Sequence, residues 1–462
     1  MKDVSMKARD TKWVDGLRGV ASVFVVTSHL TLAFGDFLLS PAPGPGLTPR
    51  WYNLPFIRTF AEGRAWVTVF LVLTGFVNGL KPIQQARSGR VNDALAGMAS
   101  SCFRRASRLV LPTFVATVFA WLICQFGGFR LAAHVDYSWW LVDTSPVPAK
   151  TMGAAIHGLF SAIYTTWTTT IDPYDKNQWT MYWIFKGSIT LYVVLLATVR
   201  AAPYYRMLVF FILLMYSWSF GDTLVGIPIY CGAMFTELWL TPSIVRFSAS
   251  RQLLNRAIPI SMVAVGLFIM SFPSQNVQFM HWSLSMNNLG LLLFPEGTET
   301  ANVWYCVGAN MITFGVLLSP DMQAFFSHPI CLWLGKQSLP IYLLHGPLMR
   351  SQLMWYLYAF IPPQWVEQYD WGGNLMSAYP IYQYPALWRL YSGFIIYVVA
   401  VGLSCHWWTL NVEPWCARTT KWLEDTMCST WDQKATSAPV LPVRSEVVAA
   451  LPGDHRIMAL PI

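Results

Sequence analysis

Apolar runs of about 20 residues recur from one end of this chain to the other. A run of that length forms a helix of about 30 Å, which matches the hydrocarbon thickness of a bilayer. The composition agrees, because 55% of the 462 residues are hydrophobic and only 12% are charged. These features predict an all-α, multi-pass transmembrane helix bundle rather than soluble domains joined by linkers.

Ten of these runs are predicted to cross the membrane. They are residues 14–39, 66–80, 109–126, 180–199, 207–220, 224–240, 258–272, 303–318, 330–356 and 387–410. Residues 152–170 are also apolar, but a crossing there would place later basic loops on the wrong side. We therefore expect residues 127–179 to form a non-cytoplasmic loop with an interfacial or re-entrant helix.

Basic residues predict the orientation, since Lys and Arg gather on the cytoplasmic side of membrane proteins. The basic residues of the amino-terminal arm and of the later basic loops fall on one side, whereas residues 273–301 and 352–388 contain neither Lys nor Arg. Both termini are thus predicted to be cytoplasmic, and the net charge of +8 requires no nucleic-acid partner. The predicted organisation is a cytoplasmic arm (1–12), a transmembrane domain (13–411) and a partly disordered tail (412–462).

Several common kinds of site have no signature here. The eight cysteines form no CxxC pair and are interpreted as buried apolar residues. The histidines show no metal-ligand spacing, which predicts no metal site. The sequence also has no Gly-rich nucleotide loop and no Gly-X-Ser-X-Gly motif, which argues against a serine esterase with a nucleophile elbow.

Two ionisable residues interrupt the first predicted span. Arg18 and His29 are eleven positions apart, which in an α-helix is about 20° past three turns and a rise of about 16.5 Å. Both side chains therefore leave one face, and ionisable groups within a span usually face the bundle interior or a wet cavity. Two simpler interpretations stay open: Arg18 can extend to lipid phosphates at the interface, and His29 can make a structural hydrogen bond.

Four segments, in order, carry a resemblance to a known family. "WVDGLRGVASVFVVTSHLTLAF" (13–34) resembles the first helix of the acyltransferase 3 family, with its Arg, ten intervening residues and His. "VFLVLTGFVNG" (69–79) and "RRASRLVLP" (104–112) are similar to the second helix and the start of the third. "WLGKQSLPIYLLHGPL" (333–348) is similar to the penultimate-helix motif, whose His is here His345. The chain as a whole is most similar to fungal members.

The resemblance implies a membrane-bound O-acyltransferase with no bound cofactor. Its donor would be acetyl-CoA or another acyl-CoA, and its acceptor a small hydroxylated molecule such as a fungal secondary metabolite. The expected location is the endoplasmic reticulum or another endomembrane. His29 would be the general base, since imidazole accepts protons near neutral pH, and Arg18 would hold a donor phosphate or the acyl group. His345 would be a second base, an oxyanion donor or a packing partner.

Further residues are implied to bind substrate. Arg104, Arg105 and Arg108 would attract a polyanionic donor to the cytoplasmic mouth, although topology alone also accounts for arginines there. The remaining candidate substrate-binding residues come from segments that follow the fungal pattern, and they are Trp179, Lys186 and Glu237.

One position departs from the family pattern. The family usually has a Glu five residues after the Trp that corresponds to Trp179, and here that position is Ile184. If the Glu orients or charges the catalytic His, another carboxylate must replace it, and Asp172, Asp175 and Glu237 are the candidates. The departure leaves open a non-catalytic relative that binds donor or acceptor.

A transporter also stays open as an alternative, because it too has many spans with charges inside the membrane. The chain shows no matching halves of the kind found in many transporters. Restoring Glu at position 184 separates the two family interpretations, since activity rises only if that carboxylate was the missing part.

Overall fold

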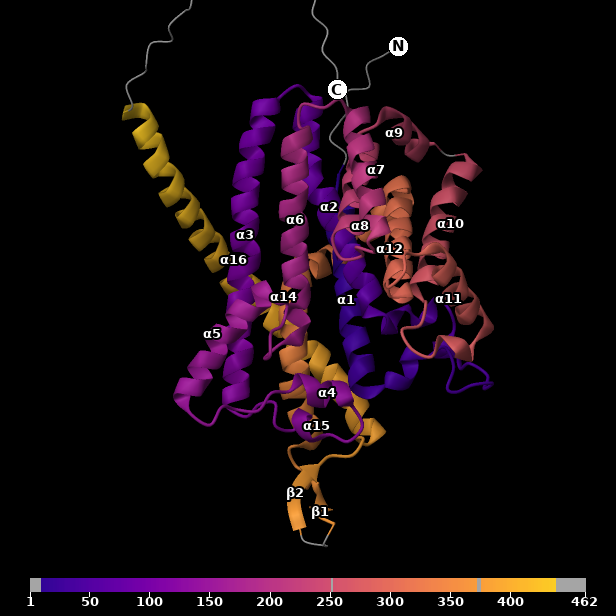
Figure 1. Cartoon of the computed structure of the whole chain (residues 1–462), viewed down its shortest axis with the longest axis vertical. Helices are drawn as coiled ribbons and strands as arrows, with labels where there is room; N and C mark the ends of the chain where they lie inside the picture. Colours follow the sequence, from indigo (N-terminus) through magenta and orange to yellow (C-terminus); the bar gives the residue numbers. More distant parts are fainter. Residues whose placement is uncertain (1–9, 251, 372–374, 438–462) are drawn as a thin grey trace, which may run out of the picture.

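The structure is a computed structural model that describes residues 10–250, 252–371 and 375–437. Seven described helices are long and apolar enough to cross a membrane. They are α1 (Lys12–Phe34), α2 (Gly63–Arg87), α3 (Val91–Gln125), α6 (Trp179–Thr198), α10 (Leu253–Met270), α12 (Thr300–Leu318) and α16 (Leu387–Ser437). Figure 1 shows most of these helices side by side in one elongated bundle, from which the carboxyl-terminal part of α16 diverges.

The three other predicted spans are helical as well. Residues 207–220 lie in α7 (Pro203–Ser219) and residues 224–240 mostly in α8 (Gly226–Trp239). These helices have 17 and 14 residues and are short for a bilayer crossing. Residues 330–356 form α14 (Pro329–Leu348), which continues through a π-helical turn (Met349–Leu353) into α15 (Met354–Tyr358). The prediction of a helix bundle is therefore confirmed, and seven helices of the described residues meet the length and hydropathy requirements for a span.

The prediction of an all-α chain is wrong at one place. Strands β1 (Gln364–Tyr369) and β2 (Leu375–Ile381) pair antiparallel in a segment predicted to be an outer loop. The sequence Gln-Trp-Val-Glu-Gln-Tyr is rich in aromatic and β-branched residues, which favour strands. The sheet projects from one end of the bundle (Figure 1), and backbone hydrogen bonds join Tyr382, just after β2, to the segment around His134.

The region between α3 and α6 holds a helix where residues 152–170 predict one. It contains α4 (Trp139–Thr144) and α5 (Met152–Thr168), flanked by short 3-10 turns, η4 (Ala132–His134) and η5 (Lys176–Gln178). Figure 1 shows α4 and α5 near the end of the bundle opposite the connection between α2 and α3. The indole of Trp121 on α3 donates to the carbonyl oxygen of Ala155 at 2.9 Å, which fastens α5 to α3.

Shorter elements complete the described chain. They are η1 (Asp36–Leu39), η2 (Trp51–Asn53), η3 (Ile57–Ala61), α9 (Pro242–Ala249), η6 (Val277–Phe279), α11 (His281–Leu293) and α13 (Pro320–Phe326). The helix α16 continues to Ser437, well beyond the predicted end of the span at residue 410. Residues 438–462, which the sequence predicts to be disordered, lie outside the described residues.

The packing of α1 against α14 positions the ionisable residues of both helices. The two backbones touch: a Cβ at Gly19 would lie 2.4 Å from the amide nitrogen of Gly335, and a Cβ at Gly335 would lie 2.2 Å from the carbonyl oxygen of Asp15. Only glycine allows this approach. The face of α1 that carries Arg18 and His29 is therefore held against α14.

Candidate active site

Two histidines from distant parts of the sequence form the centre of the candidate site. His29 comes from α1 and His345 from α14, and His29 Nδ1 lies 2.8 Å from His345 Nε2. Their ring centroids are 4.9 Å apart. His345 is fully buried, whereas His29 keeps a partly exposed surface. The structure thus brings together the two histidines that the sequence proposes as catalytic.

The hydrogen-bond partners determine which nitrogen carries the proton. His345 Nδ1 lies 2.9 Å from the carbonyl oxygen of Ile341, and a carbonyl can only accept, so Nδ1 is the donor. In a neutral imidazole the other nitrogen is then an acceptor. His345 Nε2 therefore accepts from His29 Nδ1–H, and the remaining nitrogen of His29, Nε2, is unprotonated. This arrangement leaves His29 with one nitrogen able to act as a base.

Residues of η5, just before α6, and of α16 support His345. The Asn177 side-chain nitrogen lies 3.5 Å from His345 Nε2, which agrees with an acceptor role for that nitrogen. The Tyr342 hydroxyl donates to the carbonyl oxygen of Asn177 and accepts a 2.7 Å hydrogen bond from the Thr180 hydroxyl. From α16, the Tyr397 hydroxyl donates to the carbonyl oxygen of His345 at 2.8 Å. His345 is therefore held by contacts from η5 and α16 in addition to its contact with His29 on α1.

A buried charged cluster lies beside the histidine pair. Arg350, in the π-helical turn after α14, donates to the carbonyl oxygens of Tyr174 at 2.8 Å and of Thr144, and its Nη2 lies 3.4 Å from Asp175 Oδ1. Asp172 accepts from the Thr117 hydroxyl at 2.8 Å and from two backbone amides. Burial raises the pKa of Asp175 to about 7, although the Arg350 guanidinium opposes this.

None of the candidate carboxylates takes the place of the family Glu by a direct contact with the histidines in the described part of the chain. Among the described residues, neither Asp172 nor Asp175 hydrogen-bonds to His29 or His345. Asp175 is linked to the histidine pair only through the chain, because Asn177, two residues further along, contacts His345. The direct partner of His29 is thus a neutral histidine rather than a carboxylate. Arg350 was not singled out from the sequence; its only signal was a charge within an apolar run.

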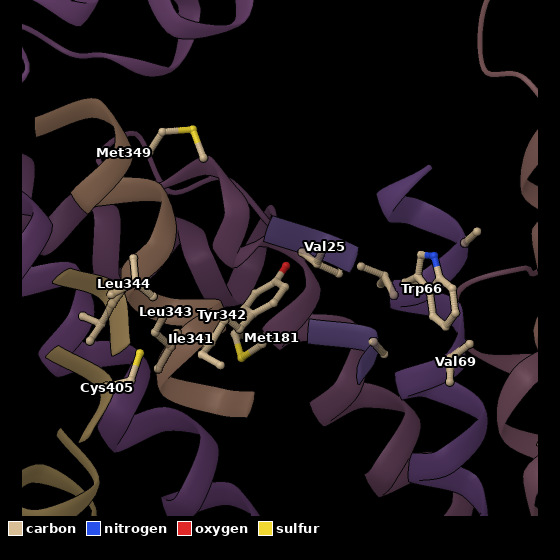
Figure 2. Packing of buried hydrophobic residues seen from close by; sticks show 14 of the residues in the cluster. Val25, Trp66, Val69, Met181, Ile341, Tyr342, Leu343, Leu344, Met349 and Cys405 are labelled. Atoms are coloured by element: carbon tan, nitrogen blue, oxygen red, sulfur yellow. The ribbon is translucent and has the colours of Figure 1, made fainter. Parts of the chain in front are cut away.

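A cavity of about 270 Å³ lies between α1, α2, α3, α6 and α14. Arg18, Arg105 and Arg108 line it, as do the hydroxyl-bearing residues Thr180 and Tyr342. Most of the remaining wall is apolar, formed mainly by Val67, Phe70, Leu73, Val77, Leu109, Met181, Ile184 and Leu339. Figure 2 shows Met181 beside Tyr342 in the surrounding apolar packing. Three of the predicted arginines therefore face a single cavity.

Polar contacts hold two of these arginines. Arg18 Nη2 lies 3.5 Å from the Ser338 hydroxyl on α14, and Arg105 Nε lies 3.2 Å from the Ser188 hydroxyl on α6.

Neither histidine lines the cavity. Tyr342 does, and its ring centroid is 5.9 Å from that of His345, one helical turn further along α14. Tyr342 thus lies between the arginine-lined space and the histidine pair.

Ile184 lines the same cavity. The position at which the family usually has Glu therefore faces the three arginines in this protein. A carboxylate there would neutralise part of their charge. With Ile184 in its place, the cavity keeps the positive charge of three guanidinium groups, which is offset at Arg18 by the exposed Asp15 at 3.4 Å and by the charge of Glu413.

The structure places four predicted substrate-binding residues outside the cavity. Arg104 is 44% exposed and lies 3.9 Å from Glu424. Lys186 is exposed, with Nζ 5.1 Å from the ring centroid of Trp183. Glu237 is fully buried between Arg87 and Arg206, where it joins α8 to α2 and α7. Trp179 packs against the hydrophobic core.

Trp140, which the sequence did not point to, also contacts His29. Its ring stacks on that of His29, with centroids 5.4 Å apart and planes 23° apart. Trp140 belongs to the short helix α4, in a region predicted only as an outer loop. An aromatic residue in such a loop is ordinary in membrane proteins, so no pattern in the sequence pointed to this contact.

Comparisons with known proteins agree with the resemblance. The model of a family described as an acyltransferase domain matches residues 11–407. The O-acetyltransferase PaAT-1 of Phomopsis amygdali is 25% identical over 382 residues, which cover 74% of this chain and 72% of that protein. Acyltransferase R4 of Phoma sp. is 21% identical and acyltransferase clz18 of Cochliobolus lunatus 20% identical, and each match covers 74% of this chain and 83% of the relative. No solved structure matches the chain.

Proposed function

The chain belongs to this acyltransferase family, and on that premise we propose that it is a membrane-bound O-acyltransferase that moves an acetyl or short acyl group from acyl-CoA to a hydroxyl of a small molecule. The observation that carries the proposal is the contact of His29 Nδ1 with His345 Nε2, which leaves Nε2 of His29 available as a base, beside a cavity lined with arginines. The acetyltransferase named among the relatives favours acetyl-CoA as the donor, and the three fungal relatives favour a secondary metabolite as the acceptor.

The cavity suits a donor with a charged and an apolar part. Guanidinium groups pair with phosphate oxygens through two parallel hydrogen bonds, so Arg18, Arg105 and Arg108 would hold the phosphates of CoA. The apolar wall would cover the linear arm between the phosphates and the thioester. The acyl group would then lie near Tyr342, next to the histidine pair.

The histidine pair would supply the proton transfers. His29 Nε2 would take the proton of the acceptor hydroxyl while the oxygen attacks the thioester carbonyl. The carbon–sulfur bond then breaks, the ester forms, and the same proton passes from His29 to the thiolate to give free CoA. His345 Nε2 accepts from His29 Nδ1–H throughout, which orients the ring and stabilises the imidazolium. In this mechanism His345, rather than a carboxylate at position 184, is the direct partner of His29.

The test is acyl transfer by membranes that contain the protein. Labelled acetyl-CoA is supplied with extracts of hydroxylated metabolites, and labelled ester is measured for wild type, His29→Ala and Arg18→Ala at matched expression. His406→Ala is the control, because His406 is an exposed residue of α16. We expect the ester with wild type and the control only. Equal labelling by His29→Ala would exclude His29 as the base, and no labelling by wild type with broadly sampled acceptors would favour a non-catalytic relative.

A further inference from the structure

The ring of His29 contacts two other rings. One is His345, through the hydrogen bond between Nδ1 and Nε2. The other is Trp140, whose nearly parallel ring has its centroid 5.4 Å from that of His29. This separation is within the range at which an aromatic face attracts a cation. The indole is 7% exposed, so the contact is shielded from solvent.

The helix that carries Trp140 is fastened to both helices of the histidine pair. At its start, the Ser138 hydroxyl donates to the carbonyl oxygen of Leu32 on α1 at 3.0 Å. At its end, the carbonyl oxygen of Thr144 accepts from Arg350, which follows α14. Ser138 also caps α4 by accepting from the amide of Leu141 at 3.3 Å. These bonds fix α4 over the site, and the position of the indole follows from them.

We propose that Trp140 is a positioning residue for the base, which keeps the His29 ring in the orientation that leaves Nε2 free and Nδ1 on His345. The inference rests on the proposed function for its catalytic consequence. The structural statement, that the indole of Trp140 covers and orients the imidazole of His29, does not depend on turnover.

The same contact has an electrostatic effect during the reaction. When His29 takes a proton it becomes a cation, and the electron-rich face of an indole stabilises a cation lying over it. Three other groups act on His29 from its own helix and from the elements packed around it: His345 accepts from Nδ1, a backbone hydrogen bond to Val25 favours the charged ring, and the Arg350 guanidinium repels the new charge. Trp140 therefore offsets part of the repulsion from Arg350.

Three variants test this role, with turnover followed as CoA release. Trp140→Leu removes the aromatic face, and Trp140→Phe keeps a smaller one. Trp139→Leu is the matched control, because Trp139 precedes Trp140 in α4 but is 59% exposed. We expect kcat to fall about 10- to 100-fold in Trp140→Leu and about three-fold in Trp140→Phe, and KM for acetyl-CoA to change by less than about two-fold. Trp139→Leu should match wild type.

A second measurement does not depend on turnover. Diethyl pyrocarbonate modifies unprotonated, accessible imidazoles, and the peptide that contains His29 can be followed by mass spectrometry. We expect the modification rate of His29 to rise several-fold in Trp140→Leu and to stay unchanged in Trp139→Leu.

The outcomes separate this inference from the proposed function. If wild type shows no turnover, the proposed function fails while the modification rates still decide whether Trp140 covers His29. Equal modification of His29 in Trp140→Leu and wild type would overturn the inference. So would a rise in KM with an unchanged kcat, since Trp140 would then contact substrate. An equal loss of kcat in Trp139→Leu would also overturn it, because the effect would belong to α4 as a whole.

Discussion

His29 Nδ1 and His345 Nε2 lie 2.8 Å apart, and the carbonyl oxygen of Ile341 determines that His29 is the donor of this pair. In serine hydrolases the partner of the catalytic imidazole is a carboxylate. Here the partner is a neutral imidazole, which fixes the tautomer without adding a charge to a buried site. In the proposed mechanism His345 would therefore act on catalysis through His29.

Replacement of His345 tests this dependence. We expect His345→Leu to lower kcat by about 100-fold, because His29 Nδ1–H loses its acceptor and the ring its orientation. His345→Gln should retain more activity, since its amide oxygen can accept from Nδ1–H. CoA release by the purified variants gives both rates. The role of His345 is wrong if the leucine and glutamine variants are equally active.

The three cavity arginines are expected to bind the donor. Arg108→Ala should raise KM for acetyl-CoA by about 10- to 100-fold, which is the effect of losing one charge-assisted contact of about 1.5 to 3 kcal/mol. Arg104→Ala is the control, because Arg104 lies in the same motif but outside the cavity. Initial rates at varied acetyl-CoA concentrations give KM for each variant. An equal rise of KM in both variants would show that only the overall positive charge of the motif affects binding.

Restoring the family carboxylate is expected to impair the protein. Ile184→Glu would place a negative charge among Arg18, Arg105 and Arg108, which weakens their attraction for phosphates. We predict a higher KM for acetyl-CoA and no gain in kcat, whereas Ile184→Gln, of similar size and no charge, should raise KM less. A gain in kcat in the glutamate variant would mean that the carboxylate belongs to the catalytic machinery after all.

Asp175 is expected to make stability depend on pH. Burial raises its pKa from 3.8 to about 7, so the folded protein binds this proton more tightly than the unfolded chain does. The resulting stabilisation is fully present below about pH 4 and is lost as the pH rises through about 7. The melting temperature of the purified protein should therefore fall between about pH 5 and pH 8, and Asp175→Asn should reduce that fall. Identical profiles for both proteins would contradict the prediction.

The glycine contact between α1 and α14 is expected to tolerate no side chain. Gly19→Ala would place its Cβ 2.4 Å from the backbone of Gly335, and overpacking of this kind costs about 1 to 3 kcal/mol or more. Gly402→Ala is the control, since a Cβ on Gly402 of α16 meets nothing within 4 Å. Thermal unfolding in detergent should show a clear loss for Gly19→Ala alone.

Part of the site follows from local sequence. The interval between Arg18 and His29 predicts one shared face of a helix, and the arginine motif that contains Arg105 and Arg108 predicts a basic patch. The first prediction depends on helix geometry, and the second on the clustering of arginines in a motif that resembles the family's. Helix geometry also explains why the predicted runs of residues 14–39 and 66–80 correspond to α1 and α2.

Contacts between distant segments did not follow from local sequence. The pairing of His29 with His345 spans 316 positions and depends on which helices pack together. Trp140 reaches His29 from a loop region, where periodicity carries no information about direction. The ion pairs of Glu237 with Arg87 and Arg206 could not be predicted either, because they join residues that are far apart in the sequence. A lone carboxylate in an apolar segment is equally typical of a binding site.

The contact between Gly19 and Gly335 also sets the distance between the arginines and the histidine pair. Gly19 lies next to Arg18, so the contact anchors the arginine end of α1 on α14, and the helix between Arg18 and His29 rises by about 16.5 Å. If the arginines hold the phosphates, the donor must span a set distance before its carbonyl meets the base. The protein would then select donors by the length of the arm between phosphate and thioester, and a compact donor such as acetyl phosphate would bind without reacting.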